Sequence, residues 1–293
     1  MKKKILLTGA SGKLGSVLIT YLKKKYSLYL IGFQKKPKNG NIINLTNSSK
    51  VKNYLNKIKP DIILHLVAMT NVDQCEKDFE KAYDLNCKTT INLVNWAYKK
   101  KCRLIYISTD QVYDNAGFNS ENKAIPKNIY SLTKYISENI SLSLPNSVVL
   151  RTNFYGFFPK HNDSLINWFL KSIQTKKETK LIKNIFFNPL YVHQLCLYIL
   201  DIIKNSNIKG IFNLGAKNKI SKGELLFKVA TKLNLDKKKL KYCNVNKIKL
   251  KTFRPNNMLM NVKKIEKQLK KKMPTIDDGI NNLIKDIKGN AFG

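Results

Sequence analysis

A threonine, a tyrosine and a lysine are spaced so that they could exchange a proton with a carbonyl oxygen. Thr109 directly follows an apolar run, Leu104–Ser108, that reads as a strand, and Tyr130 and Lys134 follow later in the chain, four residues apart. At positions i and i+4 of a helix, these two side chains share one face. A neighbouring ammonium group stabilises a phenolate and lowers the pKa of the tyrosine, which makes it a usable proton donor or acceptor. A hydroxyl at the strand end beside it could hold the carbonyl oxygen.

The Tyr-x-x-x-Lys pattern alone carries little weight in this chain. Lysine is so frequent that chance places one four residues after a tyrosine about twice, and the pattern occurs twice, at Tyr21–Lys25 and at Tyr130–Lys134. The second copy follows a strand that ends in Ser-Thr-Asp. We therefore assign the chemistry to Tyr130 and Lys134, and a structural role to Tyr21.

A glycine-rich turn, TGASGKLG at residues 8–15, lies between a predicted strand over 3–8 and a predicted helix over 12–25. Glycines at positions 9, 12 and 15 let the backbone turn tightly, approach a pyrophosphate closely and pack the helix on the sheet. The start of the helix offers N–H groups and the positive end of its dipole to phosphates. A plain tight turn is the alternative; we expect a dinucleotide to bind here.

The end of the second predicted strand, 28–33, bears on the choice of cofactor. An acidic residue at this place bonds the ribose 2′-hydroxyl and favours NAD, whereas a basic residue tolerates the 2′-phosphate of NADP. The strand is followed by Gln34, Lys35 and Lys36, with no carboxylate. We therefore expect NADPH as the cofactor, with NAD as a possible second one.

Strands and helices alternate through the first half of the chain. The other predicted strands in this half are 62–66, 104–108 and 148–151, and the other predicted helices are 79–101 and 130–144. This alternation indicates βαβ units with a parallel sheet, and strands that are apolar throughout indicate helices on both faces. We predict an α/β fold with a Rossmann-type doubly wound parallel sheet over residues 1–155, joined by a strand near 211–214.

The regular alternation of predicted strands and helices ends after residue 155. Predicted helices cover 165–173, 192–203 and 222–233. We expect residues 156–293 to form a smaller, mostly helical region that binds the substrate.

The charge of the chain is strongly positive. Its 293 residues include 54 Lys+Arg against 19 Asp+Glu, a net charge of +35, yet only three of the basic residues are arginines. Proteins that read nucleic acids depend on the arginine fork, and the lysines here are spread along the chain. We interpret them as solvated side chains and expect no specific nucleic-acid partner; non-specific binding of polyanions at low salt is the alternative.

Composition also argues against several other classes of protein. Hydrophobic residues make up 43% of the chain, which is inconsistent with intrinsic disorder. The apolar runs are shorter than the ~18–20 residues of a membrane-spanning helix. Five cysteines without a Cys-x-x-Cys pair suggest neither a metal site nor a redox disulfide. We expect a cytoplasmic protein that binds no metal and no membrane.

Several segments, in order along nearly the whole chain, resemble the extended short-chain dehydrogenase/reductases, and most closely their dTDP-4-dehydrorhamnose reductase subgroup. These segments are TGASGKLG (8–15), HLVAMTNVDQCE (65–76), ISTDQVYD (107–114), YSLTK (130–134), LRTNFYG (150–156), NPLYVHQLC (188–196), GIFNLG (210–215) and FRPNNMLMNVKKIEK (253–267).

The resemblance implies roles for individual residues. The implied catalytic set is Thr109, Tyr130 and Lys134. The residues that the resemblance implies, combined with those of the glycine turn and of the end of the second strand, form the predicted cofactor-binding set. This set is Gly9, Ser11, Gly12, Lys13, Leu14, Gln34, Asn44, Leu45, Ala68, Met69, Thr70, Tyr130 and Lys134. The implied substrate-binding set is Val72, Thr109, Asp110, Phe154 and Arg254. Asn44 stands where an aspartate is common in the family, and Phe154 where the rhamnose enzymes often have tryptophan.

One position separates two kinds of relative. Sugar-nucleotide 4,6-dehydratases carry Asp-Glu at the strand end as the acid and base of water elimination, whereas this chain has Asp110-Gln111. Because a glutamine cannot abstract a proton, simple carbonyl reduction is favoured.

The resemblance thus predicts an NADPH-dependent reductase of a nucleotide-linked 4-keto-6-deoxy sugar, with Tyr130 as proton donor, in a homodimer. Three alternatives stay open: a catalytically silent, cofactor-binding regulatory subunit of another enzyme, a sugar-nucleotide epimerase or reductase with a different substrate, and a nucleic-acid-binding protein. For the remaining chemistry-bearing residues, we expect His65 and Arg151 to be structural and Cys75 and Cys87 to be buried. Arg254 is a candidate contact for a diphosphate, since its fork suits phosphate oxygens.

Overall fold

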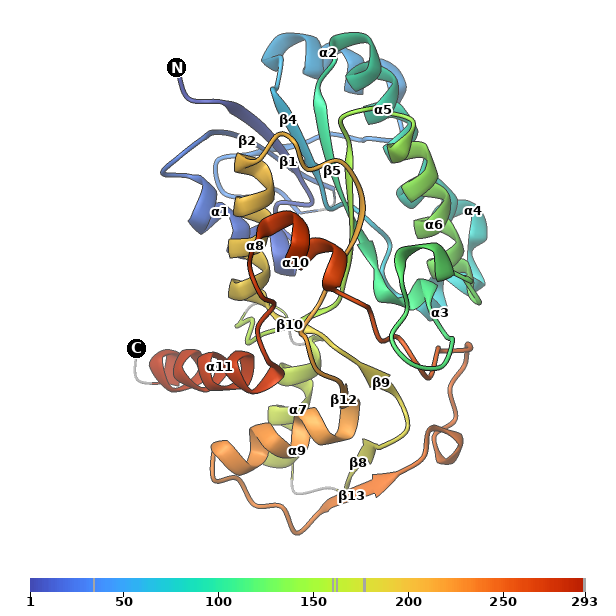
Figure 1. Ribbon diagram of the computed structural model, residues 1–293, viewed down its shortest axis with the longest axis vertical. Coiled ribbons are helices and arrows are strands. Elements are labelled where there is room, and N and C mark those ends of the chain that lie inside the picture. The colour runs from blue at the N-terminus through green and yellow to red at the C-terminus, as the bar shows by residue number, and fades with distance from the viewer. Residues whose placement is uncertain (34, 160, 162, 176–177, 292–293) are drawn as a thin grey trace. The chain divides into compact units, whose positions relative to one another are not determined.

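A seven-stranded sheet in the order β11-β6-β5-β4-β1-β2-β3 forms the centre of the fold (Figure 1). The computed structural model describes residues 1–33, 35–159, 161, 163–175 and 178–291. The strands of this sheet are β1 (Lys4–Thr8), β2 (Ser27–Gly32), β3 (Asn41–Ile42), β4 (Ile62–His65), β5 (Arg103–Thr109), β6 (Val148–Thr152) and β11 (Gly210–Leu214). Strand β1 pairs in parallel with both β2 and β4, and the β4–β5 and β2–β3 pairs are also parallel. The predicted doubly wound parallel sheet is confirmed.

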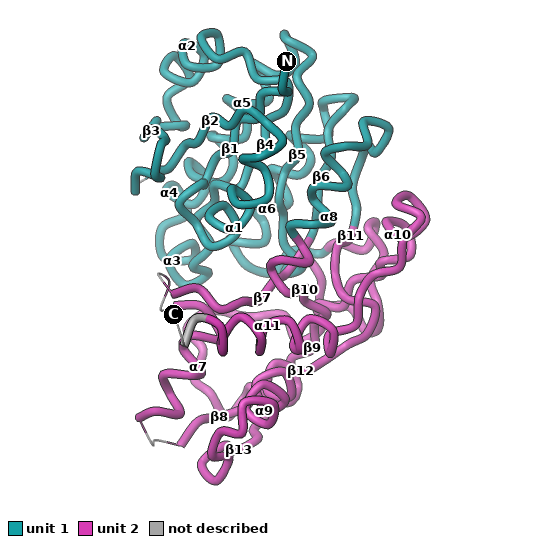
Figure 2. The backbone as a smooth tube through the Cα atoms, turned by 90° about the vertical axis from the view of Figure 1, so that its left-hand side faces the viewer, with its two compact units in different colours: residues 1–112, 125–151, 196–212 teal, residues 113–124, 152–195, 213–293 magenta. Residues whose placement is uncertain are grey.

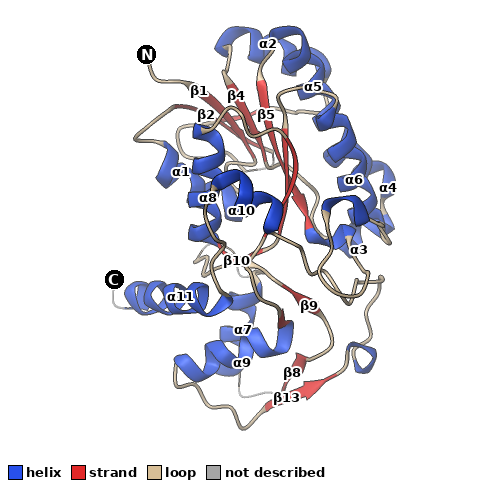
Figure 3. Cartoon of the chain, viewed as in Figure 1, coloured by secondary structure: helices blue, strands red, loops and turns tan. Residues whose placement is uncertain are grey.

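Helices connect successive strands and cover both faces of the sheet (Figure 3). These helices are α1 (Lys13–Leu22), α2 (Ser48–Ile58), α3 (Val72–Lys77), α4 (Phe79–Tyr83), α5 (Thr89–Lys100), α6 (Ile129–Leu142) and α8 (Val192–Lys204). Figure 1 shows α1 and α8 on one side of the sheet and α2, α5 and α6 on the other. This arrangement explains why the strands carry apolar residues on both faces.

The helix predicted over 79–101 is present but contains one irregular turn. The chain stays helical from Phe79 to Lys100, and a π-helical turn at Asp84–Lys88 joins α4 to α5. The hydroxyls of Thr89 and Thr90 donate to the carbonyls of Leu85 and Asn86, at 2.8 Å and 2.7 Å. Such back-bonding to the preceding turn disturbs regular helix geometry.

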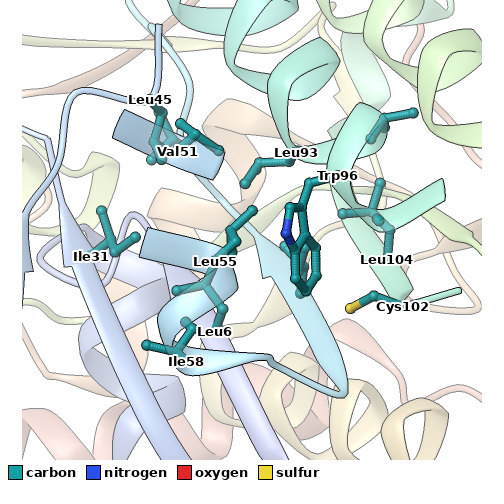
Figure 4. Packing of buried hydrophobic residues seen from close by; sticks show 14 of the residues in the cluster. Leu6, Ile31, Leu45, Val51, Leu55, Ile58, Leu93, Trp96, Cys102 and Leu104 are labelled. Carbon is teal, nitrogen blue, oxygen red and sulfur yellow. The ribbon is translucent and has the colours of Figure 1, made fainter. Parts of the chain in front are cut away.

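A hydrophobic core fills the space between the sheet and helices α2 and α5 (Figure 4). Its buried members are Leu6, Ile31, Leu45, Val51, Leu55, Ile58, Ile63, Val67, Leu93, Val94, Trp96, Ala97, Cys102, Leu104 and Leu144. The indole nitrogen of Trp96 donates to Asn56 Oδ1 at 2.9 Å, so the largest side chain of the cluster has its polar atom satisfied.

The chain divides into two compact units (Figure 2). Unit 1 consists of Met1–Val112, Ile125–Arg151 and Cys196–Phe212, and unit 2 of Tyr113–Ala124, Thr152–Leu195 and Asn213–Gly293. Short 3-10 helices lie at Asp110–Val112, Glu121–Lys123 and Val245–Lys247. Among the described residues, no helix is long and apolar enough to cross a membrane.

Unit 2 contains short paired strands that the sequence did not indicate. Its elements are β7 (Phe154–Tyr155), α7 (Leu165–Gln174), β8 (Thr179–Ile182), β9 (Phe186–Phe187), β10 (Leu190–Tyr191), β12 (Ile220–Ser221), α9 (Lys222–Lys232), β13 (Leu240–Cys243), α10 (Lys263–Leu269) and α11 (Ile276–Ala291). The strands form three pairs: β7 with β10, β9 with β12, and β8 with β13.

Candidate active site

The predicted cofactor and catalytic residues of unit 1 follow the carboxyl ends of neighbouring strands. The glycine turn follows β1, residues 68–70 follow β4, and Thr109 ends β5. Strand order reverses between β1 and β4, because the chain leads from β1 to β2 on one side and to β4 on the other. Ligands of open α/β sheets bind at this reversal, outside the carboxyl ends of the strands.

The glycine turn has a backbone that side chains would obstruct. Gly9 has a φ of 68°, and a Cβ atom there would lie 3.1 Å from backbone atoms of Leu66 and Val67. The amide of Gly12 donates to the carbonyl of Gly9 at 3.0 Å and closes the turn. Only glycine adopts such a left-handed conformation without strain, so the sequence of the turn follows from its shape.

The start of α1 fits a pyrophosphate. Gly12 is the N-cap residue of the helix, and among the described residues of its first turn none is acidic and no side chain caps the exposed amides. The helix dipole and these N–H groups favour a bound anion. Ser11 and Lys13 flank the cap and are partly exposed, whereas Leu14 is buried and anchors the helix.

Gly15 is expected to tolerate no larger residue. A Cβ atom on Gly15 would lie 2.3 Å from the carbonyl oxygen of Gly9 and 2.8 Å from Cα of Ala10. Gly15→Ala should therefore lower the free energy of unfolding by about 1–3 kcal/mol, as overpacking does. Gly289→Ala in α11 is the matched control, because its Cβ meets nothing within 4 Å. Equal unfolding midpoints for the two variants would show that the turn can relax.

The outer cofactor residues lie after β3. The side-chain oxygen of Asn44 accepts hydrogen bonds from the amide and the hydroxyl of Thr46, at 3.0 Å and 2.7 Å. Leu45 is buried in the core, and its carbonyl accepts from Asn92 Nδ2 at 2.8 Å. Gln34 lies outside the described residues, so its predicted part in cofactor choice stays a prediction.

A single asparagine ties the segment after β4 to the catalytic helix. Asn86 accepts from the amide of Met69 at 2.7 Å, and its Nδ2 donates to Met69 O at 3.3 Å and Thr133 Oγ1 at 2.9 Å. Asn86 lies in the π-helical turn, a feature often found at functional sites. Sequence reasoning missed Asn86 because its spacing gives no sign of this turn.

Helix α6 brings Tyr130 to the end of β5. A capping box between Asn128 and Ser131 fixes where the helix begins, so Tyr130 lies in its first turn. The phenol of Tyr130 lies near the hydroxyl of Thr109, and both side chains are buried. The Thr109 hydroxyl donates to Asp110 Oδ1 at 3.4 Å. Thr109 Oγ1 also accepts from the amide of Gln111 at 3.2 Å. The structure therefore brings together the two hydroxyls that we expected to lie side by side from their positions in the sequence.

Burial raises the pKa of Tyr130 above its ordinary value, and nearby Asp110 and Cys75 act in the same direction. The nearby hydroxyl of Thr109 acts against this shift and lowers the pKa. Tyr130 packs in a cluster with Val72, Cys75 and Ala82, and Met69 lies against it. This setting keeps the phenol protonated at neutral pH.

Lys134 lies one helical turn after Tyr130 and is also buried. Its Nζ donates to the carbonyl of Ile107 at 2.7 Å and lies 4.1 Å from the centre of the Tyr106 ring. Burial lowers the pKa of Lys134 to about 7, although Glu138 raises it. The expected lowering of the Tyr130 pKa by this amine stays a prediction.

A buried ion pair lies one further turn along α6. Glu138 accepts from Arg151 Nε at 2.9 Å and from Arg151 Nη2 at 2.6 Å, and both side chains are buried. The hydroxyl of Ser108 donates to the same carboxylate at 2.5 Å. The pair therefore joins α6 to β5 and β6, and it confirms the structural role predicted for Arg151. The spacing of Glu138, four residues after Lys134, is the signal that could have singled it out.

His65 is a core residue, as predicted. Its Nδ1 lies 2.7 Å from the hydroxyl of Thr8 and its Nε2 lies 3.1 Å from that of Thr90. Burial lowers its pKa to about 3, with Lys134 adding to the effect, so the ring stays neutral. Cys75 and Cys87 are buried, also as predicted.

Two predicted substrate residues belong to unit 2. Phe154 lies in β7, is half-buried and contacts Phe158 edge to face, with ring centres 6.4 Å apart. Arg254 is partly exposed, and its Nη1 donates to the carbonyl of Thr252 at 3.1 Å.

Comparison with known proteins identifies the family. The family model described as RmlD substrate binding domain matches residues 2–288. The chain belongs to this family. The spore coat polysaccharide biosynthesis protein SpsK of Bacillus subtilis is 29% identical over 217 residues, which span 72% of each chain. Methionine adenosyltransferase 2 subunit beta of Xenopus laevis is 26% identical over 275 residues, 90% of this chain and 82% of that one.

Solved structures of the family have the same fold. The crystal structure of dTDP-4-dehydrorhamnose reductase from Bacillus anthracis, in complex with NADP, has a TM-score of 0.88 and 25% identity, with 98% of this chain and all of that one covered. The RmlD family assignment confirms the resemblance seen in the sequence and places the chain among the short-chain dehydrogenase/reductases. The roles of the individual site residues stay predictions.

Proposed function

We propose that the protein catalyses the NADPH-dependent reduction of a nucleotide-linked 4-keto-6-deoxy sugar, the activity class of the NADP-bound structural relative. The observation that carries the proposal is that the buried hydroxyls of Thr109 and Tyr130 lie close together at the carboxyl end of β5. The glycine turn after β1 supports the proposal that NADPH binds, because the start of α1 suits the pyrophosphate of the cofactor.

Each residue of the set has a distinct part in this proposal. Bound NADPH supplies a hydride to the carbonyl carbon of the sugar. Tyr130 donates a proton to the carbonyl oxygen, and Thr109 holds that oxygen by a hydrogen bond. Lys134 binds the hydroxyls of the nicotinamide ribose. When it is protonated, Lys134 also stabilises the phenolate that Tyr130 becomes after it has donated its proton.

The protonation of Tyr130 suits reduction. Because burial raises its pKa, Tyr130 enters the reaction with its proton in place. Gln111 stands where a dehydratase needs a base, and its amide cannot abstract a proton. Apart from the hydride that NADPH would supply, carbonyl reduction needs only groups that this chain has.

Each unit has residues with an expected binding role. In unit 1 these residues bind the cofactor, and in unit 2 Phe154 and Arg254 are the residues that we expect to contact a sugar nucleotide. Arg254 suits the diphosphate, since a guanidinium fork matches two phosphate oxygens. We place this activity in a cytoplasmic homodimer without a specific nucleic-acid partner.

The test is oxidation of NADPH and NADH with a panel of nucleotide 4-keto-6-deoxy sugars. We expect turnover with at least one sugar, and a lower KM for NADPH than for NADH. Tight binding of NADPH without oxidation by any member of the panel would contradict the proposed reaction.

A regulatory subunit is the second candidate, and one observation favours it. The relative named methionine adenosyltransferase 2 subunit beta matches 90% of this chain, a longer stretch than SpsK does. This candidate predicts bound NADPH, no turnover, and a stoichiometric complex with an enzyme that copurifies from the source cell. Turnover that disappears in Tyr130→Phe would exclude it.

A further inference from the structure

The loop that carries Arg254 is fastened to the segment that follows the catalytic strand. We propose that Asp114 is a positioning residue that holds this loop and so directs Arg254 toward a nucleoside diphosphate. The inference rests on the proposed function, in which Arg254 contacts the diphosphate of the substrate. Asp114 and Arg254 both belong to unit 2.

Asp114 binds the backbone directly after the arginine. Its Oδ1 accepts from the amide of Asn256 at 2.7 Å and from that of Asn257 at 3.2 Å. Hydrogen bonds to an ionised carboxylate are stronger than neutral ones. The two amides belong to the second and third residues after Arg254, so the contact restrains the backbone from which the guanidinium projects.

Other contacts hold the loop at Asn256 and beyond. The carbonyl of Asn256 accepts from the amide of Phe186 at 2.8 Å, so Asp114 restrains the amide side of this residue. Asn257 Nδ2 donates to the carbonyls of Asn115 and Gly117, the latter at 2.9 Å. The amide of Asn119 donates to Leu259 O, and that of Asn261 to Asn119 O, both at 2.8 Å. These bonds would keep the two segments together without the Asp114 carboxylate, so its loss should shift the Arg254 end of the loop rather than unfold it.

The printed hydrogen bonds of Arg254 go to its own loop, whereas those of the other two arginines go to other elements. Arg151 is fixed by Glu138, and Arg103 donates to carbonyls at the end of α8 and just beyond, at Ile203, Asn205 and Ile208. Arg254 is partly exposed and donates to Thr252 O of its own loop. Since a guanidinium binds phosphate through a planar fork, a small rotation of the loop misdirects it.

The test compares the affinities of dTDP and dTMP in Asp114 variants by calorimetry. We expect Asp114→Ala to weaken dTDP binding about tenfold, a loss typical of misplaced binding groups, and to change dTMP binding much less. Asp114→Asn keeps an oxygen acceptor and should retain most of the affinity. The Kd for NADPH and the unfolding midpoint should not change.

A double-mutant cycle then separates positioning from structure. Asp236→Ala is the matched control, because Asp236 also accepts from a backbone amide, that of Lys238 at 2.9 Å, in an exposed turn. If Asp114 acts through Arg254, Asp114→Ala should weaken dTDP binding no further in an Arg254→Met background. Independent, additive losses would overturn the inference, and so would a loss for Asp114→Ala equal to that of Asp236→Ala. If the wild-type protein bound no dTDP, the proposed function would fail first and the inference with it.

Discussion

Replacing Tyr130 with phenylalanine should reduce kcat by about 10²–10⁴-fold, the usual contribution of a general acid. The substitution removes the hydroxyl that lies near Thr109 and keeps the ring within its cluster of Val72, Cys75 and Ala82. The Kd for NADPH should therefore stay close to the wild-type value. Steady-state oxidation of NADPH and titration of its fluorescence measure the two quantities separately.

Tyr21→Phe is the matched control for this prediction. Tyr21 begins the other Tyr-x-x-x-Lys pattern of the chain and lies in α1, which ends at Leu22. Its loss should leave kcat unchanged. A Tyr130→Phe variant that keeps wild-type turnover would remove Tyr130 from the role of proton donor.

Glu138→Gln should destabilise the protein by about 3–5 kcal/mol, because breaking one side of a buried ion pair leaves the other charge uncompensated. Arg151 is the residue whose charge would be left uncompensated, and its side chain is only 2% exposed. Lys134 would also lose the carboxylate that raises its pKa. The midpoint of thermal unfolding should fall by about 10 °C. Glu80→Gln, on the exposed surface of α4, is the control and should change the midpoint little.

A second variant separates the charge from the packing. Glu138→Met combined with Arg151→Met removes both charges and fills a similar volume, so it should recover much of the lost stability. If the double variant were less stable than Glu138→Gln alone, the ion pair would contribute to stability beyond the compensation of one buried charge by the other.

Most of unit 1 could be predicted from the sequence because local signals determine its elements. Apolar runs at 62–66 and 148–151 correspond to β4 and β6 within a residue or two, since buried parallel strands have few other compositions. The turn at Gly9 and Gly12 was predictable for the same reason: its backbone excludes side chains.

The parts that could not be predicted depend on contacts between distant segments. The β8–β13 pair joins Thr179 to Leu240, and no alternating pattern or turn marks either strand. The bond between Asp114 and Asn256 likewise joins segments 142 residues apart. For the site, spacing placed Thr109 beside Tyr130, but the state of Lys134 depends on its burial, which the sequence does not show.

Hydride transfer is the step that tests the proposed reaction most directly. The wild-type protein would be incubated with a dTDP-linked 4-keto-6-deoxy sugar and NADPH that carries deuterium at the transferred position of C4. We expect a reduced sugar nucleotide that contains one deuterium, detected by mass spectrometry, and almost none with Tyr130→Phe. A protein that binds this NADPH tightly but leaves the keto sugar unlabelled and unreduced would contradict the assignment as a reductase of this sugar class.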